Sequence, residues 1–375
     1  MPLPKVGIII LAYHNSEALA DLGRCFTSLE RVDYPRDRWE IIVVDNPSPS
    51  GECRTYLEKN WLPRSGQTLP RVYVVKPDRN LGFTGGNNVG FLAATLGKCD
   101  YVYLLNQDTD VAPDFLSAAV SRAESDSKVG LVQSLLLLGK ERDRVNSMGN
   151  AFHFFGHSYC GGYRMNCDQA VSCLEAERSD NPDLEIPTAS GAALLARTAA
   201  IQDVNGLFDE KFFLYHEDVD LSLRMRLRGW KVVIEPVSRV WHHYQFSRSI
   251  SKYRWMERNR LVTVFSFYRK RTLALLALPL IAVDLISLAT AFKGGWLRQK
   301  LEVYADFLKL STWRWILERR QEIQTGRALT DREFLKDAEA RILFQEEGMQ
   351  TPFVTKFANP LMSAFWKVAY AVIRW

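Results

Sequence analysis

Three side chains that carry oxygen follow one short apolar run. Asn106, Asp108 and Asp110 stand within the five residues after Tyr101–Leu105. The run is rich in β-branched and aromatic residues, which is typical of a buried strand. Ligands of open α/β sheets bind outside the carboxyl ends of the strands, and carboxylates there can hold a divalent cation that in turn holds a diphosphate. A solvated, Asp-rich turn is the alternative interpretation.

A second acidic group stands at the start of a predicted helix. Apolar residues recur at helical spacing through residues 219–230, and Glu217 and Asp218 come directly before or at its first turn. Unpaired N–H groups at a helix start favour anions, so these acids could simply stabilise the helix. With Asp220 close behind, however, the acids are denser than capping requires.

Polar residues also end two other apolar runs. Tyr13 ends the first run and Asp45 ends the second. Asp45 could accept hydrogen bonds from a base or a ribose, or it could form a turn or a helix cap. The segment 80–90 holds four glycines between polar residues, and glycine lets a backbone approach a nucleotide closely. It lacks the GxGxxG pattern and follows the third run, so a dinucleotide fold fits badly. A plain glycine-rich turn is the alternative.

His242 could complete a metal site that Asp108 begins, because neutral imidazole is a common metal ligand. A purely structural histidine is the alternative. His153 and His157 fall in the segment 139–187, which we interpret as an irregular insertion without assigned chemistry.

The order of apolar and helical segments along the chain predicts the fold that positions these residues. Apolar runs alternate with helical segments, which predicts a doubly wound, mostly parallel α/β sheet. The predicted strands are residues 6–11, 39–44, 71–75 and 101–105.

Composition narrows the class of protein. The chain has 375 residues, 47% of them hydrophobic, and a formal net charge of +5, which suits phosphorylated substrates or anionic lipid. No recognition motif indicates nucleic acid. Six scattered cysteines without a CxxC pair indicate reduced thiols, and the start of the chain resembles no secretory signal, so we expect a cytoplasmic catalytic domain.

The composition changes after residue 265, so we predict a catalytic domain over 1–265 and a helical, aromatic and basic membrane-proximal region over 266–375. Residues 272–292 are long enough to span a bilayer, but Pro279 and Asp284 interrupt them. This favours a helix that lies at the membrane interface over a span. A helical subdomain packed on the catalytic core is the alternative.

Because of the order and spacing of these polar residues, the chain resembles family 2 glycosyltransferases of the GT-A fold, particularly the bacterial rhamnosyltransferase-like branch. The resemblance covers about residues 5–265. The motifs that carry it are Tyr13 with Asn15, Val44-Asp45-Asn46, Asn80-Leu-Gly-Phe-Thr-Gly-Gly-Asn-Asn, Leu105-Asn-Gln-Asp108-Thr, Gly206-Leu-Phe-Asp-Glu, Glu217-Asp218-Val-Asp-Leu and His242.

The resemblance implies a nucleoside-diphosphate sugar as donor and Mg²⁺ or Mn²⁺ as cofactor. The family's DxD motif maps onto Asn106-Gln107-Asp108, so an asparagine replaces its first aspartate. The implied metal ligands are Asp108, Asp110 and His242, and the implied catalytic residues are Asp218 as base with Glu217 beside it. The implied donor contacts are Tyr13, Asn15, Asp45, Asn80, Gly82, Gly86, Asn87 and Asn106.

The implied activity is inverting transfer of a single sugar to a hydroxyl of a lipid-linked or cell-surface glycan, at the inner face of the cell membrane. Processive members carry QxxRW, whereas this chain has Ser251-Lys-Tyr-Arg254-Trp255, which argues for single additions. An inactive sugar-nucleotide-binding relative and a nucleotidyltransferase that makes sugar nucleotides are the alternatives. The sequence leaves the sugar, base, acceptor and oligomeric state open.

Overall fold

The computed structural model describes residues 3–15, 17–243, 252–343 and 351–375. The chain divides into two compact units. The first consists of Met1–Asn150, Cys160–Met225 and Trp230–Tyr244, and the second of Ala151–Tyr159, Arg226–Gly229 and Gln245–Trp375. The boundary that we expect at residue 265 falls inside a helix of the second unit, and as a functional boundary it stays a prediction.

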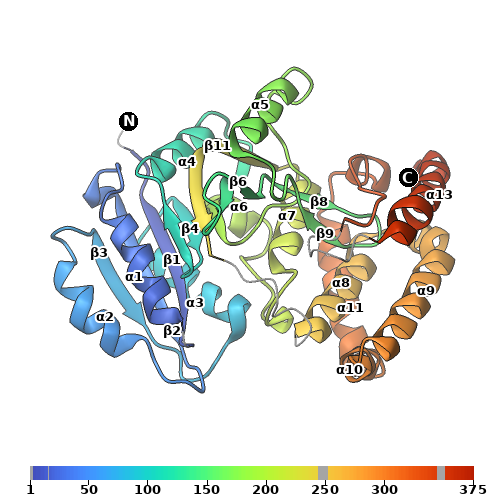
Figure 1. Cartoon of the computed structure of the whole chain (residues 1–375), viewed down its shortest axis with the longest axis horizontal. Helices are drawn as coiled ribbons and strands as arrows, with labels where there is room; N and C mark the ends of the chain where they lie inside the picture. Colours follow the sequence, from blue (N-terminus) through green and yellow to red (C-terminus); the bar gives the residue numbers. More distant parts are fainter. Residues whose placement is uncertain (1–2, 16, 244–251, 344–350) are drawn as a thin grey trace. The chain divides into compact units, whose positions relative to one another are not determined.

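The first unit is built on one twisted sheet, in the order β3-β2-β1-β4-β10-β6-β11-β5, with β7 paired to β6 (Figure 1). Its strands are β1 (Val6–Tyr13), β2 (Trp39–Asn46), β3 (Arg71–Val75), β4 (Tyr101–Leu105), β5 (Thr109–Val111), β6 (Val129–Leu138), β7 (Val145–Ser147), β10 (Ala193–Arg197) and β11 (Lys231–His242). The first four are mutually parallel, whereas β10 runs antiparallel to both of its neighbours. The predicted mostly parallel α/β sheet is confirmed.

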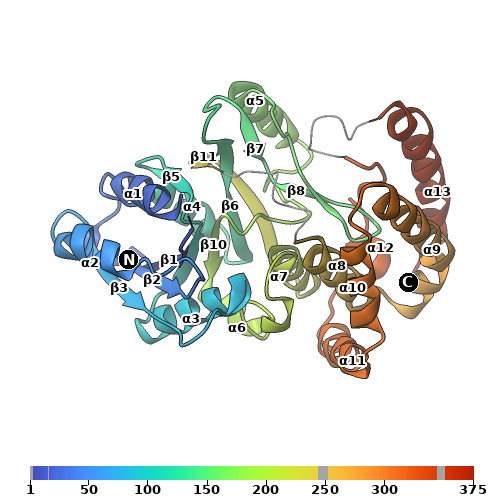
Figure 2. The same ribbon diagram turned by 60° about the horizontal axis from the view of Figure 1, so that its bottom comes forward.

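Helices cover both faces of this sheet, as Figures 1 and 2 show. They are α1 (Ala18–Leu29), α2 (Arg54–Asn60), α3 (Gly82–Leu96), α4 (Phe115–Glu124), α5 (Cys167–Glu177), α6 (Thr198–Asp203) and α7 (Glu217–Leu227), with short 3₁₀ turns at Arg36–Arg38, Leu62–Arg64 and Glu210–Phe212. Side chains alternate across a strand, so Ile8 of β1 packs with Phe26 of α1 on one face while Ile9 packs with Ala94 of α3 on the other. Burial on both faces explains the continuous apolar runs.

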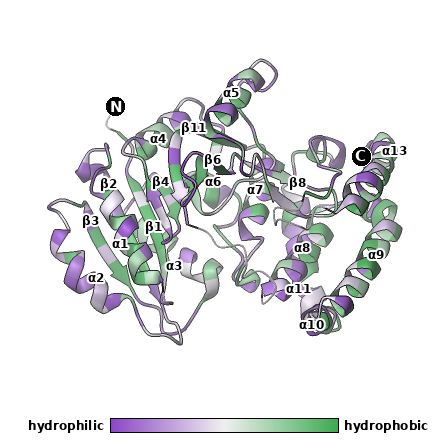
Figure 3. Ribbon diagram, in the orientation of Figure 1, coloured by the Kyte–Doolittle hydropathy of each residue, from purple (hydrophilic) through white to green (hydrophobic). Residues whose placement is uncertain are grey.

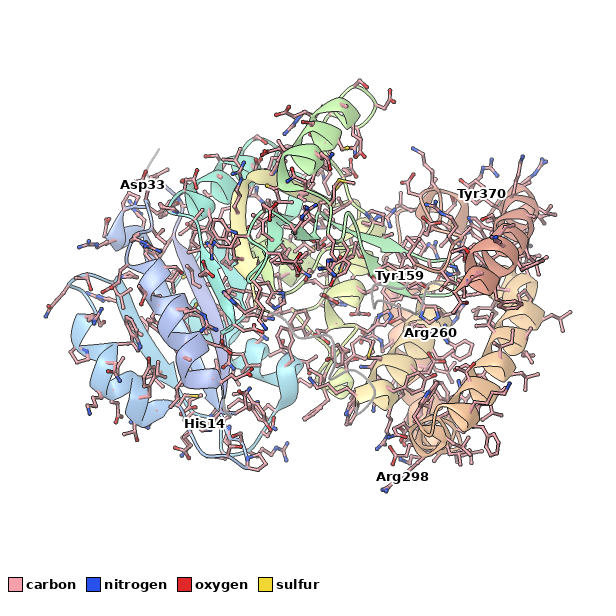
Figure 4. All side chains as sticks on the ribbon, in the orientation of Figure 1. His14, Asp33, Tyr159, Arg260, Arg298 and Tyr370 are labelled. Carbon is pink, nitrogen blue, oxygen red and sulfur yellow. The ribbon has the colours of Figure 1, made fainter. Side chains whose placement is uncertain are left out.

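The second unit is helical. It contains α8 (Tyr253–Phe267), α9 (Lys270–Lys293), α10 (Leu297–Phe307), α11 (Leu310–Thr325), α12 (Asp331–Phe334), a π-helical turn (Val354–Ala358) and α13 (Asn359–Val372). The hairpin of β8 (Asn150–Phe152) and β9 (Ser158–Cys160) brings His153 into it. Figure 4 labels Tyr159 and Arg260 in this unit.

Within the described residues, α9 is the one helix long and apolar enough to cross a membrane, judged by length and composition. Figure 3 shows its largely hydrophobic residues. Pro279 lies inside the helix without ending it. Asp284 accepts hydrogen bonds from Lys300 Nζ at 2.6 Å and from Tyr304 Oη. The acid that interrupts the apolar stretch is therefore neutralised by α10.

Candidate active site

The carboxyl ends of β1, β2 and β4 meet at one edge of the sheet because these strands are parallel. Figure 4 labels His14, which follows β1 at this edge. The loops after β1 and β2 are joined there, since Ser48 Oγ donates to the carbonyl of His14 at 2.8 Å. The predicted donor contacts Tyr13, Asp45 and Asn106 all belong to this edge.

Gln107 connects β1 to the loop after β4. Its Oε1 accepts from Tyr13 N at 2.8 Å, and its Nε2 donates to Tyr13 O at 3.1 Å. Sequence reasoning missed this role, because Gln107 is only the middle residue of the metal tripeptide. The two hydrogen bonds fix the end of β1 beside Asp108.

Asp45 is fully buried at the end of β2. Its Oδ1 accepts from Cys53 N at 3.0 Å, so it does shape the following turn, as the alternative interpretation expects. Its Oδ2 has no hydrogen-bond partner in the described residues. A buried acceptor without a partner is costly, so this atom is suited to an N–H or O–H of a ligand.

Asn80 holds the loop that leads into α3. Its Oδ1 accepts from Gly82 N and from Asn46 Nδ2, both at 2.8 Å. Asn46 Oδ1 in turn accepts from Leu81 N at 3.0 Å. These bonds bind the end of β2 to the start of α3, so Asn80 positions the loop.

The glycines of α3 have packing roles. Gly82 has φ +68°, and a Cβ there would lie 2.3 Å from the carbonyl oxygen of Phe213. A Cβ on Gly86 would lie 2.3 Å from Leu11 Cδ1. Close packing against the chain itself therefore accounts for both glycines, and their contact with a nucleotide stays a prediction.

Two further predicted donor contacts have local partners. Asn15 Oδ1 accepts from Glu17 N at 2.8 Å, and the buried Asn87 donates to Phe83 O at 2.8 Å. Both shape the backbone around the site, and their contact with a donor also stays a prediction.

Asp108 and His242 form the predicted metal pair. His242 Nε2 lies 3.4 Å from Asp108 Oδ1, and its Nδ1 lies 3.1 Å from Asn146 Oδ1. With Asn146 accepting, Nδ1 carries the ring proton and Nε2 directs a lone pair toward the carboxylate. A cation or a second proton is needed between two such acceptors, so this pair fits a metal ion. Burial opposes the charge on Asp108, but the positive charge that His242 carries when its ring is protonated outweighs burial, and in that form of the ring the pKa of Asp108 lies below its ordinary value.

Asp110, the third expected metal ligand, has protein partners for both of its oxygens. Its Oδ2 accepts from Arg142 at 2.9 Å and its Oδ1 lies 2.8 Å from His243 Nε2. These two partners outweigh burial and lower the pKa of Asp110. Across the residues that the structure describes, no three His, Cys, Asp or Glu side chains form a metal cluster. Asp108 and His242 are thus the expected ligands that lie side by side, and a metal role for any of the three residues stays a prediction.

Asp218 lies in the first turn of α7. Its Oδ2 accepts from Gly191 N at 3.0 Å and its Oδ1 from Val219 N at 2.8 Å. Burial raises the pKa of Asp218 despite these bonds, which makes it a stronger base. The neighbouring Glu217 is buried, and burial raises its pKa well above the ordinary value.

A short backbone segment connects the two acidic groups. Gly191 binds Asp218, and the carbonyl of the next residue, Ala192, accepts from Asn106 N at 3.0 Å. Antiparallel β10 then continues directly beside β4, with Ala193 opposite Leu105. The loop that carries Asp108 and the helix start that carries Asp218 therefore lie around the same end of β10.

The turn before α7 is strained. Phe213, Tyr215 and His216 have φ values of +63°, +66° and +73°, in the left-handed region that bulky residues rarely adopt. Such strain persists only where the surrounding structure holds it, and it clusters at functional sites. Sequence reasoning missed this turn, and also missed Asn146, Gly191 and Arg142.

Residues 4–262 match the family described as Glycosyltransferase like family 2. The chain is 26% identical over 215 residues to the N-acetylglucosaminyl-diphospho-decaprenol L-rhamnosyltransferase of Mycobacterium tuberculosis, which covers 54% of this chain and 66% of that protein. It is 26% identical over 247 residues to the O-antigen biosynthesis protein RfbC of Myxococcus xanthus, covering 65% of this chain and 18% of that protein. The chain thus spans less than two thirds of either relative.

Solved structures share the fold. The mannosyltransferase PcManGT from Pyrobaculum calidifontis, in complex with GDP-Man and Mn²⁺, aligns with 86% of each chain at 16% identity and a TM-score of 0.50. GalNAc-T7 with UDP, GalNAc and Mn²⁺ aligns with 72% of this chain and 49% of its own at 15% identity and a TM-score of 0.52. The expected family and fold are both confirmed: this chain belongs to glycosyltransferase family 2 and has the GT-A fold.

Proposed function

We propose that this glycosyltransferase moves a single sugar from a nucleoside-diphosphate sugar to a hydroxyl of a lipid-linked or cell-surface glycan, with inversion at the anomeric carbon. The observation that carries the proposal is the shared segment 191–192, which holds the base candidate Asp218 and the Asp108 loop around one strand end. One acid is suited to a cation there and the other to a proton.

The residues divide the chemistry as follows. Asp45 Oδ2, which has no partner among the described residues, accepts from the base or ribose of the donor. Asp108 and His242 hold Mg²⁺ or Mn²⁺, which when bound neutralises charge on the diphosphate. Asp218 takes the proton of the acceptor hydroxyl as its oxygen bonds to the anomeric carbon, while the bond from that carbon to the diphosphate oxygen breaks. A single displacement from the opposite face inverts the centre.

Purified full-length protein tests the proposal with a panel of UDP-, GDP- and dTDP-linked sugars. Because the mycobacterial relative is named as an L-rhamnosyltransferase, rhamnose is the first donor to try. We expect one donor to release nucleoside diphosphate with Mn²⁺ or Mg²⁺ and to stop on chelation. Binding of a sugar nucleotide without any hydrolysis or transfer would instead identify an inactive binding protein.

The helical unit is proposed to rest on an anionic membrane surface, at the cytoplasmic face. Exposed apolar residues follow helical spacing on α9, as Leu278, Ile281 and Leu285, and around α13, as Phe357 and Leu361. Residues 270–293 contain one acid, already paired with Lys300, and residues 351–375 contain none, whereas the two segments together hold six lysines and arginines. Such basic helices are attracted to anionic lipid.

Vesicle flotation tests this surface. We expect binding to phosphatidylglycerol vesicles, weaker binding to phosphatidylcholine alone, and loss of binding in the double variant Phe357→Ser, Leu361→Ser. A paired change at exposed positions of the first unit, Leu92→Ser with Leu96→Ser, is the control. Equal flotation of both double variants would contradict the assignment.

A further inference from the structure

Glu217 is a buried acid without a counter-charge. It is 7% exposed, and its Oε2 has no hydrogen-bond partner in the part of the chain that the structure describes. No basic side chain among those residues forms an ion pair with it. The nearby Asp220 is neutralised, since Arg224 Nε donates to it at 2.8 Å. Glu217 is therefore left beside one further acid, Asp218.

The two neighbouring acids are treated differently by the backbone. Both oxygens of Asp218 accept N–H groups, from Gly191 and Val219, and hydrogen bonds of this kind stabilise an ionised carboxylate. The carboxyl group of Glu217 meets one backbone N–H, its own, and its Oε2 has no partner among the described residues. When two carboxyl groups share a buried site, their environments separate their ionisation, and the less supported group keeps its proton. Burial and the charge of Asp218 act in the same direction on the pKa of Glu217, raising it.

We propose that Glu217 keeps its proton in the resting enzyme and donates a hydrogen bond through its carboxyl O–H to an oxygen of the bound sugar substrate, while Asp218 alone acts as base. This rests on the proposed function. An O–H in this position has no acceptor in the described chain, so the acceptor is supplied by the ligand. A sugar hydroxyl or ring oxygen provides such an acceptor, and an ionised glutamate could not donate to it.

The proposal is tested by steady-state transfer with three variants of the full-length protein. Glu217→Gln keeps a neutral donor of similar shape and should lose a few-fold in kcat/KM. Glu217→Ala leaves the sugar oxygen unpaired and should lose about 10- to 100-fold, part of it in KM. Asp218→Asn should lose on the order of 10²–10⁴ in kcat. A loss in Glu217→Gln as large as that in Asp218→Asn would overturn the proposal, and so would wild-type kinetics in Glu217→Ala.

Failure of the proposed function is separately visible. If Asp218→Asn turns over normally, the assigned base is wrong, whatever the Glu217 variants do. A readout independent of activity is the infrared carbonyl band of a protonated carboxyl group at neutral pH. We expect this band in the wild-type protein and not in Glu217→Gln; its absence from the wild type would overturn the proposal.

Discussion

Buried carboxylates of the two units have different partners. In the helical unit, Glu257 Oε2 lies 2.8 Å from Arg260 Nε, and Asp306 Oδ2 lies 2.7 Å from Arg254 Nε. Each of these acids is neutralised by a guanidinium within its own unit. Paired in this way, they stabilise the packing of helices and offer no free charge to a ligand.

Three acids of the first unit show the opposite pattern. The buried Asp45 and Glu217 and the half-buried Asp218 are not ion-paired with any Lys, Arg or His in the described residues, and backbone N–H groups are the donors that hold Asp45 and Asp218. An acid that is buried but lacks a cation has a cost that the fold alone does not repay. The partner, more than the burial, therefore separates structural acids from those that we propose to act on substrate.

The largest expected effect is a loss of stability when a buried ion pair of the helical unit is broken. Glu257→Gln removes the partner of a buried arginine, and we expect the free energy of unfolding to fall by about 3–5 kcal/mol. Urea denaturation measures it. The control is Glu302→Gln, which removes an exposed pair with Arg298 and should cost under about 1 kcal/mol. Equal costs would erase the distinction between buried and exposed pairs.

The next effect separates two aspartates two residues apart. Asp108→Asn should reduce nucleoside diphosphate release by about 10²–10³-fold, as for loss of one electrostatic group at a reacting centre. Asp110→Asn should cost less than about tenfold, because both oxygens of Asp110 are already bound to Arg142 and His243. Release assayed across a Mn²⁺ titration compares them. A larger loss at residue 110 would reverse the assignment.

A third effect concerns pH. His153 is fully buried in the helical unit, and burial lowers its pKa to about 4 from the ordinary 6.5. Its folded form is neutral, with Nδ1 accepting from Phe155 N at 3.0 Å and Nε2 beside Ala340 O at 3.2 Å. The unfolded chain binds the proton more tightly, so the stability due to this group is complete above pH 6.5 and is lost as the pH falls toward 4.

The loss should reach roughly 3 kcal/mol in wild-type protein, from about 1.36 kcal/mol per pKa unit. Unfolding free energies measured between pH 7 and pH 4 in wild type and in His153→Gln give the difference. Parallel pH profiles of the two proteins would exclude His153 as the source.

The smallest expected effect is on metal affinity and concerns Asn146, the neighbour of His242. Asn146→Ala removes the acceptor that orients His242, and supporting residues of this kind are worth about 10- to 100-fold in metal affinity. Mn²⁺ affinity from isothermal calorimetry with UDP present measures it. Asn146→Asp keeps an acceptor and should keep most of the affinity. Unchanged affinity in the alanine variant would separate Asn146 from the metal site.

The elements that carry the site could be predicted because their signal is local. A continuous apolar run defines β1, and its last residue brings Tyr13 to the edge; the same holds for β2 with Asp45. Membership of the family could likewise be predicted from the order of short motifs.

What could not be predicted depends on contacts between distant residues. The hydrogen bonds of Gln107 join positions 94 residues apart, and the contact of His242 with Asn146 joins positions 96 apart. Asp110 has the same residue type as Asp108 in the sequence, and only its contacts with the distant Arg142 and His243 distinguish it. No spacing rule encodes such pairings, because they arise only when the sheet has formed.

The glycines of α3 have a consequence for how this enzyme can change. Gly82, Gly86 and Gly90 recur every four residues, and their missing Cβ atoms leave room for Phe213, Leu11 and Ile9. The helix therefore rests with bare backbone on both β1 and the turn that precedes the acids. Backbone cannot adjust by switching rotamers, so the distance between β1 and the turn that precedes α7 is fixed by this packing. If the proposed site is right, new sugar preferences would have to come from changes of side chains, since a larger distance between β1 and this turn would require α3 itself to move.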